Sequence, residues 1–177
     1  LYIQINLTSD AKLILDLINS EFPDDIEILF KYISFYFQGQ KWNDLLLTYA
    51  EIYKLDPERN KIIYKIYDLG IATDNLDLVK KILLDLKSVF NNPEILNLLI
   101  EISEQQGNIN DSIKFINELI NNNGSSNELI TKLSILHLRF EDYQKVIDII
   151  KPIYISRNSS LELLKFYLIA HSELENF

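Results

Sequence analysis

Residues 39–57 read GQKWNDLLLTYAEIYKLDP, and the pattern of this stretch returns along the chain. A short polar turn comes first, a bulky apolar residue follows it, and apolar residues then recur at helical spacing. The bulky residue after the turn repeats at intervals of 34, 33, 34 and 34 residues: Trp42, Leu76, Ile109, Tyr143 and Phe177. A fixed period of this length is typical of solenoids built from stacked helix pairs.

Each period carries two apolar stripes with helical spacing. Positions are counted from residues 26, 60, 93, 127 and 161. The fourth position of each period, before the turn, is occupied by Leu29, Ile63, Leu96, Ile130 and Leu164. The twenty-fourth position, after the turn, is occupied by Tyr49, Leu83, Ile116 and Ile150. Neither helix can bury its stripe alone, so we expect successive pairs to stack around a shared core. The sequence therefore predicts an all-α solenoid whose antiparallel helix pairs turn near residues 39–42, 73–76, 106–109 and 140–143.

The period also predicts the organisation of the chain as one continuous array. We expect repeats at residues 26–59, 60–92, 93–126 and 127–160. Residues 1–23 fit the end of a truncated repeat and residues 161–177 fit the beginning of another. The sequence begins and ends inside a repeat, so we expect the chain to be a piece of a longer protein.

Local signals predict several helix ends. Ser9 and Asp10 are good caps for a helix that would place Ala11, Leu15 and Ile18 on core positions, because a short side-chain oxygen accepts the free backbone N–H groups. Three prolines extend this pattern: Pro23 and Pro57 are expected to end helices, and Pro93 is expected to begin one.

The pattern resembles the tetratricopeptide repeat (TPR), a helix-turn-helix unit of about 34 residues. The match is clearest over residues 42–57 and over residues 104–112, and it extends from about residue 9 to residue 177. The resemblance implies a right-handed superhelical α-solenoid with a concave binding face. Where the family favours small residues this chain has the bulky Ile33, Leu45 and Ile52, so we expect helix spacing and superhelical pitch to differ from the family's. Other solenoids of helical pairs are the alternative.

Composition narrows the classes of function. The formal net charge of -9 and the pI near 4.7 oppose binding to nucleic acid and to anionic membranes. No apolar run is long enough to insert directly into a membrane. The chain has no cysteine, which excludes disulfides and cysteine-ligated metals. Cytoplasm and periplasm are both compatible with this composition, and it assigns neither compartment nor oligomeric state.

The sequence carries no motif for catalysis, cofactor binding or metal binding. His-Glu-x-x-His spacing, phosphate-binding glycine loops and nucleophile elbows are absent. The two histidines, His137 and His171, are 34 residues apart and share one repeat position, so we expect packing roles for them. We therefore predict a protein that is not an enzyme, with no catalytic, cofactor or metal-ligating residues.

The resemblance also implies where a partner binds. Groove positions of the family fall here on residues that the repeat does not require to be apolar, such as Phe30, Phe37, Tyr64 and Ile71. Such clustered apolar surface often marks a binding site. Acidic residues occupy groove positions further along the chain, namely Glu94, Glu101 and Glu104. We expect these seven residues to line a partner-binding groove; the alternative is that neighbouring helices cover the four apolar ones.

These observations predict a non-enzymatic protein interaction module that binds a peptide or helix of a partner in its concave groove. One alternative is a regulatory or targeting array attached to a larger enzyme or assembly whose active part lies outside this sequence. A second is an architectural array that stacks end to end. RNA binding is a third, and the acidic balance disfavours it.

Overall fold

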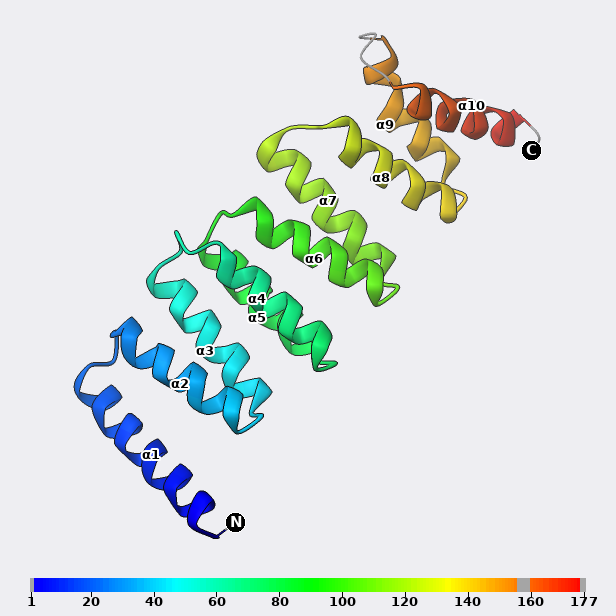
Figure 1. Ribbon diagram of the computed structural model, residues 1–177. Coiled ribbons are helices and arrows are strands. Elements are labelled where there is room, and N and C mark those ends of the chain that lie inside the picture. Colours follow the sequence, from blue (N-terminus) through cyan, green and yellow to red (C-terminus); the bar gives the residue numbers. More distant parts are fainter. Residues whose placement is uncertain (1, 156–159, 176–177) are drawn as a thin grey trace. The chain divides into compact units, whose positions relative to one another are not determined.

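The computed structural model describes residues 2–155 and 160–175, with side chains from residue 10 onward. All regular elements in these ranges are α-helices (Figure 1), as the sequence predicts. The helices form two compact units, residues 1–95 and residues 96–177, and the boundary falls in the first turn of α6. No described helix has the combination of length and apolar character needed to cross a membrane.

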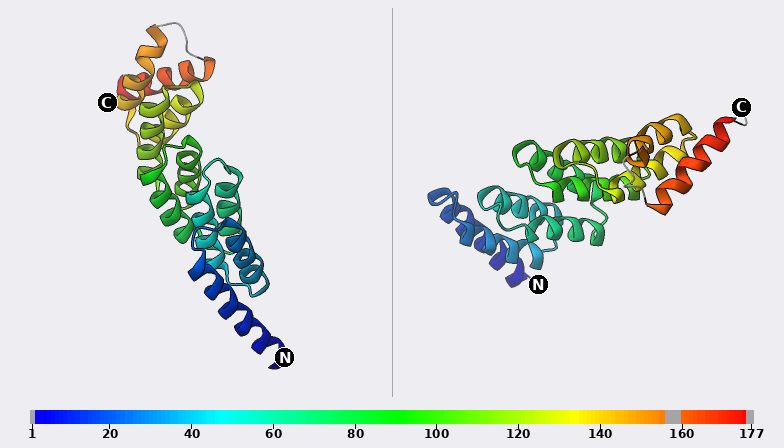
Figure 2. Two further views of the ribbon diagram at one scale, coloured as in Figure 1. Left: turned by 90° about the vertical axis from the view of Figure 1, so that its left-hand side faces the viewer. Right: turned by 90° about the horizontal axis from the view of Figure 1, so that it is seen from above.

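The first unit contains five helices in the described residues: α1 (Tyr2–Glu21), α2 (Ile26–Gln38), α3 (Trp42–Leu55), α4 (Lys61–Ala72) and α5 (Leu76–Val89). Consecutive helices run antiparallel, so α2 and α4 point in the same direction and α3 runs opposite to both (Figures 1 and 2). Helix α3 packs against α2, α4 and α5. It thereby joins α2 and α4, which are the first helices of two neighbouring helix pairs.

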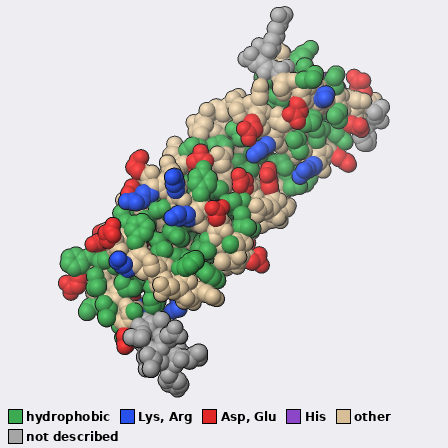
Figure 3. Space-filling model, viewed as in Figure 1, with side chains coloured by type: hydrophobic (Ala, Val, Ile, Leu, Met, Phe, Trp, Pro, Cys, Tyr) green, Lys and Arg blue, Asp and Glu red, His purple; other side chains and the backbone are tan. Residues whose placement is uncertain are grey.

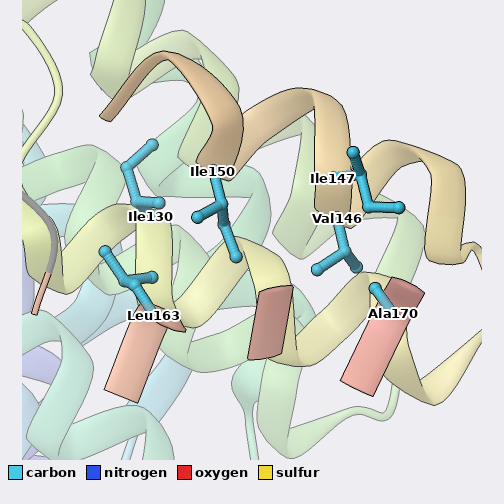
Figure 4. Close-up of a cluster of buried hydrophobic side chains, with 6 residues drawn as sticks. All are labelled: Ile130, Val146, Ile147, Ile150, Leu163 and Ala170. Atoms are coloured by element: carbon cyan, nitrogen blue, oxygen red, sulfur yellow. The ribbon is translucent and has the colours of Figure 1, made fainter. Parts of the chain in front are cut away.

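The second unit contains most of α6 (Pro93–Gln105), followed by α7 (Ile109–Asn123), α8 (Asn127–Arg139), α9 (Tyr143–Ile155) and α10 (Leu161–Glu175). Helix α8 packs against α7, α9 and α10, and α9 packs against α10. The cluster in Figure 4 joins α8, α9 and α10 through buried apolar side chains: Ile130, Val146, Ile147, Ile150, Leu163 and Ala170. In α9, Ile150 follows Val146 and Ile147 by four and three residues, and in α10 Ala170 follows Leu163 by seven, so these residues share the inner side of their helix.

The turns lie where the period predicts them, and they share one local solution. The second residue after each of α2, α4, α6 and α8 has positive φ: 53° at Gln40, 55° at Asp74, 67° at Gly107 and 57° at Glu141. The next N–H group donates to a carbonyl five residues back, as from Lys41 to Tyr36 and from Asn75 to Gly70. This is a Schellman-type ending, and it satisfies carbonyl groups that a helix otherwise leaves free.

Both predicted stripes contribute to the core. At the fourth position, Leu29, Ile63, Leu96 and Ile130 are buried and Leu164 is half-buried. At the twenty-fourth position, the aliphatic residues Leu83, Ile116 and Ile150 are buried and Tyr49 is half-buried. The prolines also behave as predicted: Pro23 and Pro57 follow helix ends, and Pro93 is the first residue of α6. The exact division into repeats stays a prediction.

The predicted cap at Ser9 and Asp10 is wrong. Helix α1 begins at Tyr2 and passes through both residues without a break. The expected core stripe of α1 is wrong in part, because Ala11 is exposed and Ile18 is 39% exposed, while Leu15 is half-buried. Ser9 and Asp10 can cap a helix start, but the residues before Ser9 are themselves helical, so both residues lie within α1.

Candidate functional site

The candidate site lies on α2 and α4, where the predicted apolar residues sit in matching places. Phe30 and Phe37 are seven residues apart on α2, and Tyr64 and Ile71 are seven apart on α4. Seven residues make nearly two helical turns, so each pair shares one side of its helix. The two helices run in the same direction and both pack against α3 (Figure 1). Phe37 and Ile71 both lie in the last turn of their helices, because α2 ends at Gln38 and α4 ends at Ala72.

The ring of Phe30 contacts a residue of the loop before α4. The guanidinium carbon of Arg59, just before α4, lies 5.7 Å from the centroid of the Phe30 ring. Arg59 is fixed in turn by a 2.6 Å contact from its Nε to Oδ2 of Asp56. Phe30 is half-buried. The contact with Arg59 links α2 to the segment before α4, as in the alternative that neighbouring segments cover these aromatics.

Tyr64 reaches from α4 to the start of α6. Its hydroxyl donates a hydrogen bond to Oε2 of Glu94, and its side chain is 40% exposed. The same helix start is fixed by Asn92, whose Oδ1 accepts from the backbone N–H of Glu94 at 2.9 Å. Asn92 also donates to the Tyr53 hydroxyl at 2.8 Å, so the segment before α6 is tied to α3. Tyr64 and Glu94 thus belong to a polar link between helices.

Phe37 and Ile71 are the most exposed of the four predicted apolar site residues, with 61% and 47% of their surfaces exposed. The Phe37 ring meets Trp42 edge to face with 5.9 Å between ring centroids, which fixes its direction. In the space-filling view, hydrophobic side chains reach the surface of the first unit beside Lys and Arg side chains (Figure 3). We call the exposed side of α2 and α4 that carries Phe37, Tyr64 and Ile71 the α2/α4 face.

Glu101 and Glu104 belong to the second unit. Both are exposed on α6 and lie three residues apart, so they share one side of that helix. The structure therefore brings Phe37, Tyr64 and Ile71 to the surface of one unit and places these two carboxylates on the other.

Sequence reasoning did not anticipate a second exposed apolar group, on α1. Leu13, Ile14 and Leu17 are exposed by 67%, 58% and 66%. Asp16 of the same helix accepts a 2.7 Å hydrogen bond from the Tyr32 hydroxyl of α2. The spacing of these residues signals an amphipathic helix, but spacing alone does not tell which side meets a neighbour.

The two histidines both belong to the second unit. No group of three or more His, Asp or Glu residues suited to a metal ion occurs in the described part of the chain. His137 is buried at 6% exposure, and its Nδ1 lies 3.6 Å from Oδ2 of Asp142. The His171 ring packs edge to face on Tyr167 with 4.6 Å between centroids. Both histidines thus make packing contacts inside the second unit.

Comparison with known proteins identifies the fold. No protein-family model and no curated protein matches the sequence. Solved structures do match. YrrB, described as "a TPR protein with an unusual peptide-binding site", is 9% identical with a TM-score of 0.55, over 92% of this chain and 84% of that chain. MamA is 13% identical with a TM-score of 0.52, over 83% of this chain and 81% of that chain. At these identities the likeness concerns the fold alone, and that fold is the helical solenoid of TPR proteins.

Proposed function

We propose that this chain, which has the fold of TPR proteins, is a non-enzymatic protein interaction module that seats a peptide or helix of a partner on the α2/α4 face. The observation that carries the proposal is the exposure of Phe37 and Ile71. Both are large apolar residues at equivalent places of two successive first helices, outside the stripes that build the core. Burial of such side chains against a partner would remove apolar surface from water and stabilise the complex.

The geometry favours an elongated partner. Ile71 lies in the last turn of α4, and Tyr64 lies almost two turns earlier, or about 10 Å along the helix axis. An extended segment or an amphipathic helix can contact both levels of such a face. The likeness to YrrB, a protein described as having a peptide-binding site, supports this class of partner.

Selection from a random phage-displayed peptide library on the whole chain would test the proposal. Calorimetry would then compare the selected peptides on the original chain and on the variants Phe37→Ser and Ile71→Ser. We expect each variant to weaken binding by about 1 to 3 kcal/mol, the usual effect of losing an apolar anchor. The melting temperature should change little, because surface substitutions usually cost less than about 0.5 kcal/mol.

Phe140→Ser is the matched control, since Phe140 is 50% exposed and lies in the second unit after α8. It should leave peptide affinity unchanged. The proposal is wrong if no peptide is enriched, or if the Phe37, Ile71 and Phe140 variants bind the selected peptides equally well. A large loss of stability in Phe37→Ser would show instead that this ring belongs to the core.

A further inference from the structure

The α2/α4 face carries a charge among its apolar side chains. Asp68 lies on α4 four residues after Tyr64 and three residues before Ile71, which is the spacing of one helix side. It is exposed, and its carboxylate makes no ion pair or hydrogen bond within the described residues. The carboxylate of Glu94, at the start of α6, already accepts a hydrogen bond from the Tyr64 hydroxyl. Asp68 is therefore a carboxylate of this face that is open to a partner.

The basic residues of α4 lie away from the end that carries Ile71. The Nζ atom of Lys65 is 5.8 Å from the centroid of the Tyr49 ring, which turns it toward α3. Lys61 is exposed at the start of α4, seven residues before Asp68, or about 10 Å along the axis. Glu27 is exposed at the corresponding end of α2, so the beginning of the face carries both signs of charge. Asp68 is the charged side chain of α4 nearest to Ile71 in the helix.

We infer that the occupant of the α2/α4 face is a basic amphipathic segment of a partner protein, with an apolar side chain on Phe37 and Ile71 and a Lys or Arg against Asp68. This inference rests on the proposed function and adds the chemistry of the partner to it. An acidic partner would meet like charge, and a wholly apolar one would bury a carboxylate without a counter-charge. Both arrangements are costly at an interface.

Synthetic peptides of equal length can test the inference on the whole chain. The first is an amphipathic Leu/Lys helix, the second has Glu at every Lys position, and the third keeps Lys but replaces Leu by Ser. We expect the Leu/Lys peptide to bind at least about tenfold more tightly than either of the others, because it alone supplies both the apolar surface and the positive charge. Its affinity should fall as salt is added, since salt screens exposed charges.

Charge reversal at Asp68 separates a specific ion pair from general attraction to an acidic protein. Asp68→Lys should weaken binding of the Leu/Lys peptide and strengthen binding of the Leu/Glu peptide, each by about tenfold. Asp85→Lys is the matched control, because Asp85 is exposed on α5 and the substitution changes the net charge equally. It should alter both affinities much less than Asp68→Lys does.

The outcomes distinguish the inference from the proposed function. If the Leu/Glu peptide binds as well as the Leu/Lys peptide, or if Asp68→Lys and Asp85→Lys behave alike, the basic partner is wrong. The proposed site then still stands, provided that Phe37→Ser weakens the peptide that binds. If none of the peptides binds, or if binding ignores Phe37→Ser, both the inference and the proposed site are overturned.

Discussion

Val79 occupies the space that a side chain on Gly70 would need. A Cβ atom placed on Gly70 would lie 2.3 Å from Cγ2 of Val79, well inside contact distance. Gly70 is in the last turn of α4, Val79 is in the first turn of α5, and both are buried. The glycine is thus required by the close approach of two helices and not by a turn.

We predict that Gly70→Ala lowers the free energy of unfolding by about 1 to 3 kcal/mol, the usual cost of overpacking. Alanine is the better helix former by about 1 kcal/mol, so the steric cost has to exceed that gain. Urea denaturation followed by circular dichroism measures the difference. A more stable Gly70→Ala protein would show that α4 and α5 can separate at little cost.

The double variant Gly70→Ala, Val79→Ala isolates the contact. Each change alone should destabilise, the first by crowding and the second by leaving a cavity. Together they should cost less than the sum, with a coupling of about 0.5 to 3 kcal/mol, because the new methyl group fills space that Val79 has vacated. Strictly additive effects would mean that the two residues do not touch.

The recurring positive φ in the turns makes a prediction about glycine. Gln40, Asp74 and Glu141 adopt a left-handed conformation that costs most residues about 1 kcal/mol or more, whereas Gly107 adopts it freely. Gln40→Gly should therefore stabilise the chain slightly or leave it unchanged, although glycine loses more entropy on folding. Gly107→Ala should destabilise it by about 1 kcal/mol. Thermal unfolding monitored by circular dichroism would measure both changes.

Gly39 is the control for these turn variants, because it directly precedes Gln40 and has a negative φ of -81°. A Cβ at Gly39 would make only ordinary contacts, the nearest at 3.4 Å from the Phe35 carbonyl oxygen. Gly39→Ala should be neutral or stabilising. Equal losses in Gly39→Ala and Gly107→Ala would contradict the role assigned to φ.

Two adjacent leucines test the helical frame. Leu83 is fully buried and Leu84 is 36% exposed. Leu83→Ala should cost about 2 to 5 kcal/mol, since it loses the transfer energy of the side chain and leaves a cavity. Leu84→Ala should cost clearly less, because much of its side chain is already in water. Denaturant titration of both variants gives the comparison, and similar losses would show that the core stripe of α5 is misplaced.

The elements that repeat are the ones that sequence predicts well. The turn at residues 39–41 and the burial of Leu83 follow from the period, because each repeat solves the same packing problem with the same residue classes. Features without a counterpart in other repeats escape this reasoning. Pro152 lies inside α9, where packing of α9 against α8 and α10 outweighs the local cost of proline.

The candidate site shows the same division. The period places Phe37 and Ile71 outside the core stripes, and both are exposed. It places Phe30 equivalently to Tyr64, yet each has a different neighbour. Arg59 covers Phe30 from a loop, and Tyr64 is linked to Glu94 across thirty residues of sequence. Such contacts depend on side-chain reach between segments, and no spacing rule within one helix encodes them.

The buried His137 predicts a pH dependence of stability. Burial lowers the pKa of His137 below its ordinary value of 6.5; Asp142 opposes this shift and Lys145 reinforces it. The unfolded chain, with its higher histidine pKa, binds more protons than the folded chain in this range, so the free energy of unfolding falls as pH drops through about 6.5. The loss should level off once pH is below the folded pKa. The lowered pKa of Asp142, which arises chiefly from its contact with Lys145, acts in a more acidic range, below its ordinary 3.8.

Urea denaturation at a series of pH values between about 7.5 and 5 would measure this slope. We expect His137→Gln to flatten it, whatever its effect on stability at pH 7.5, because glutamine does not titrate. His171→Gln is the matched control: it removes the other histidine, which packs on Tyr167 and is half-buried. That variant should keep the slope. If instead His171→Gln flattens the slope and His137→Gln retains it, then proton uptake by His137 is not what weakens the fold in mild acid.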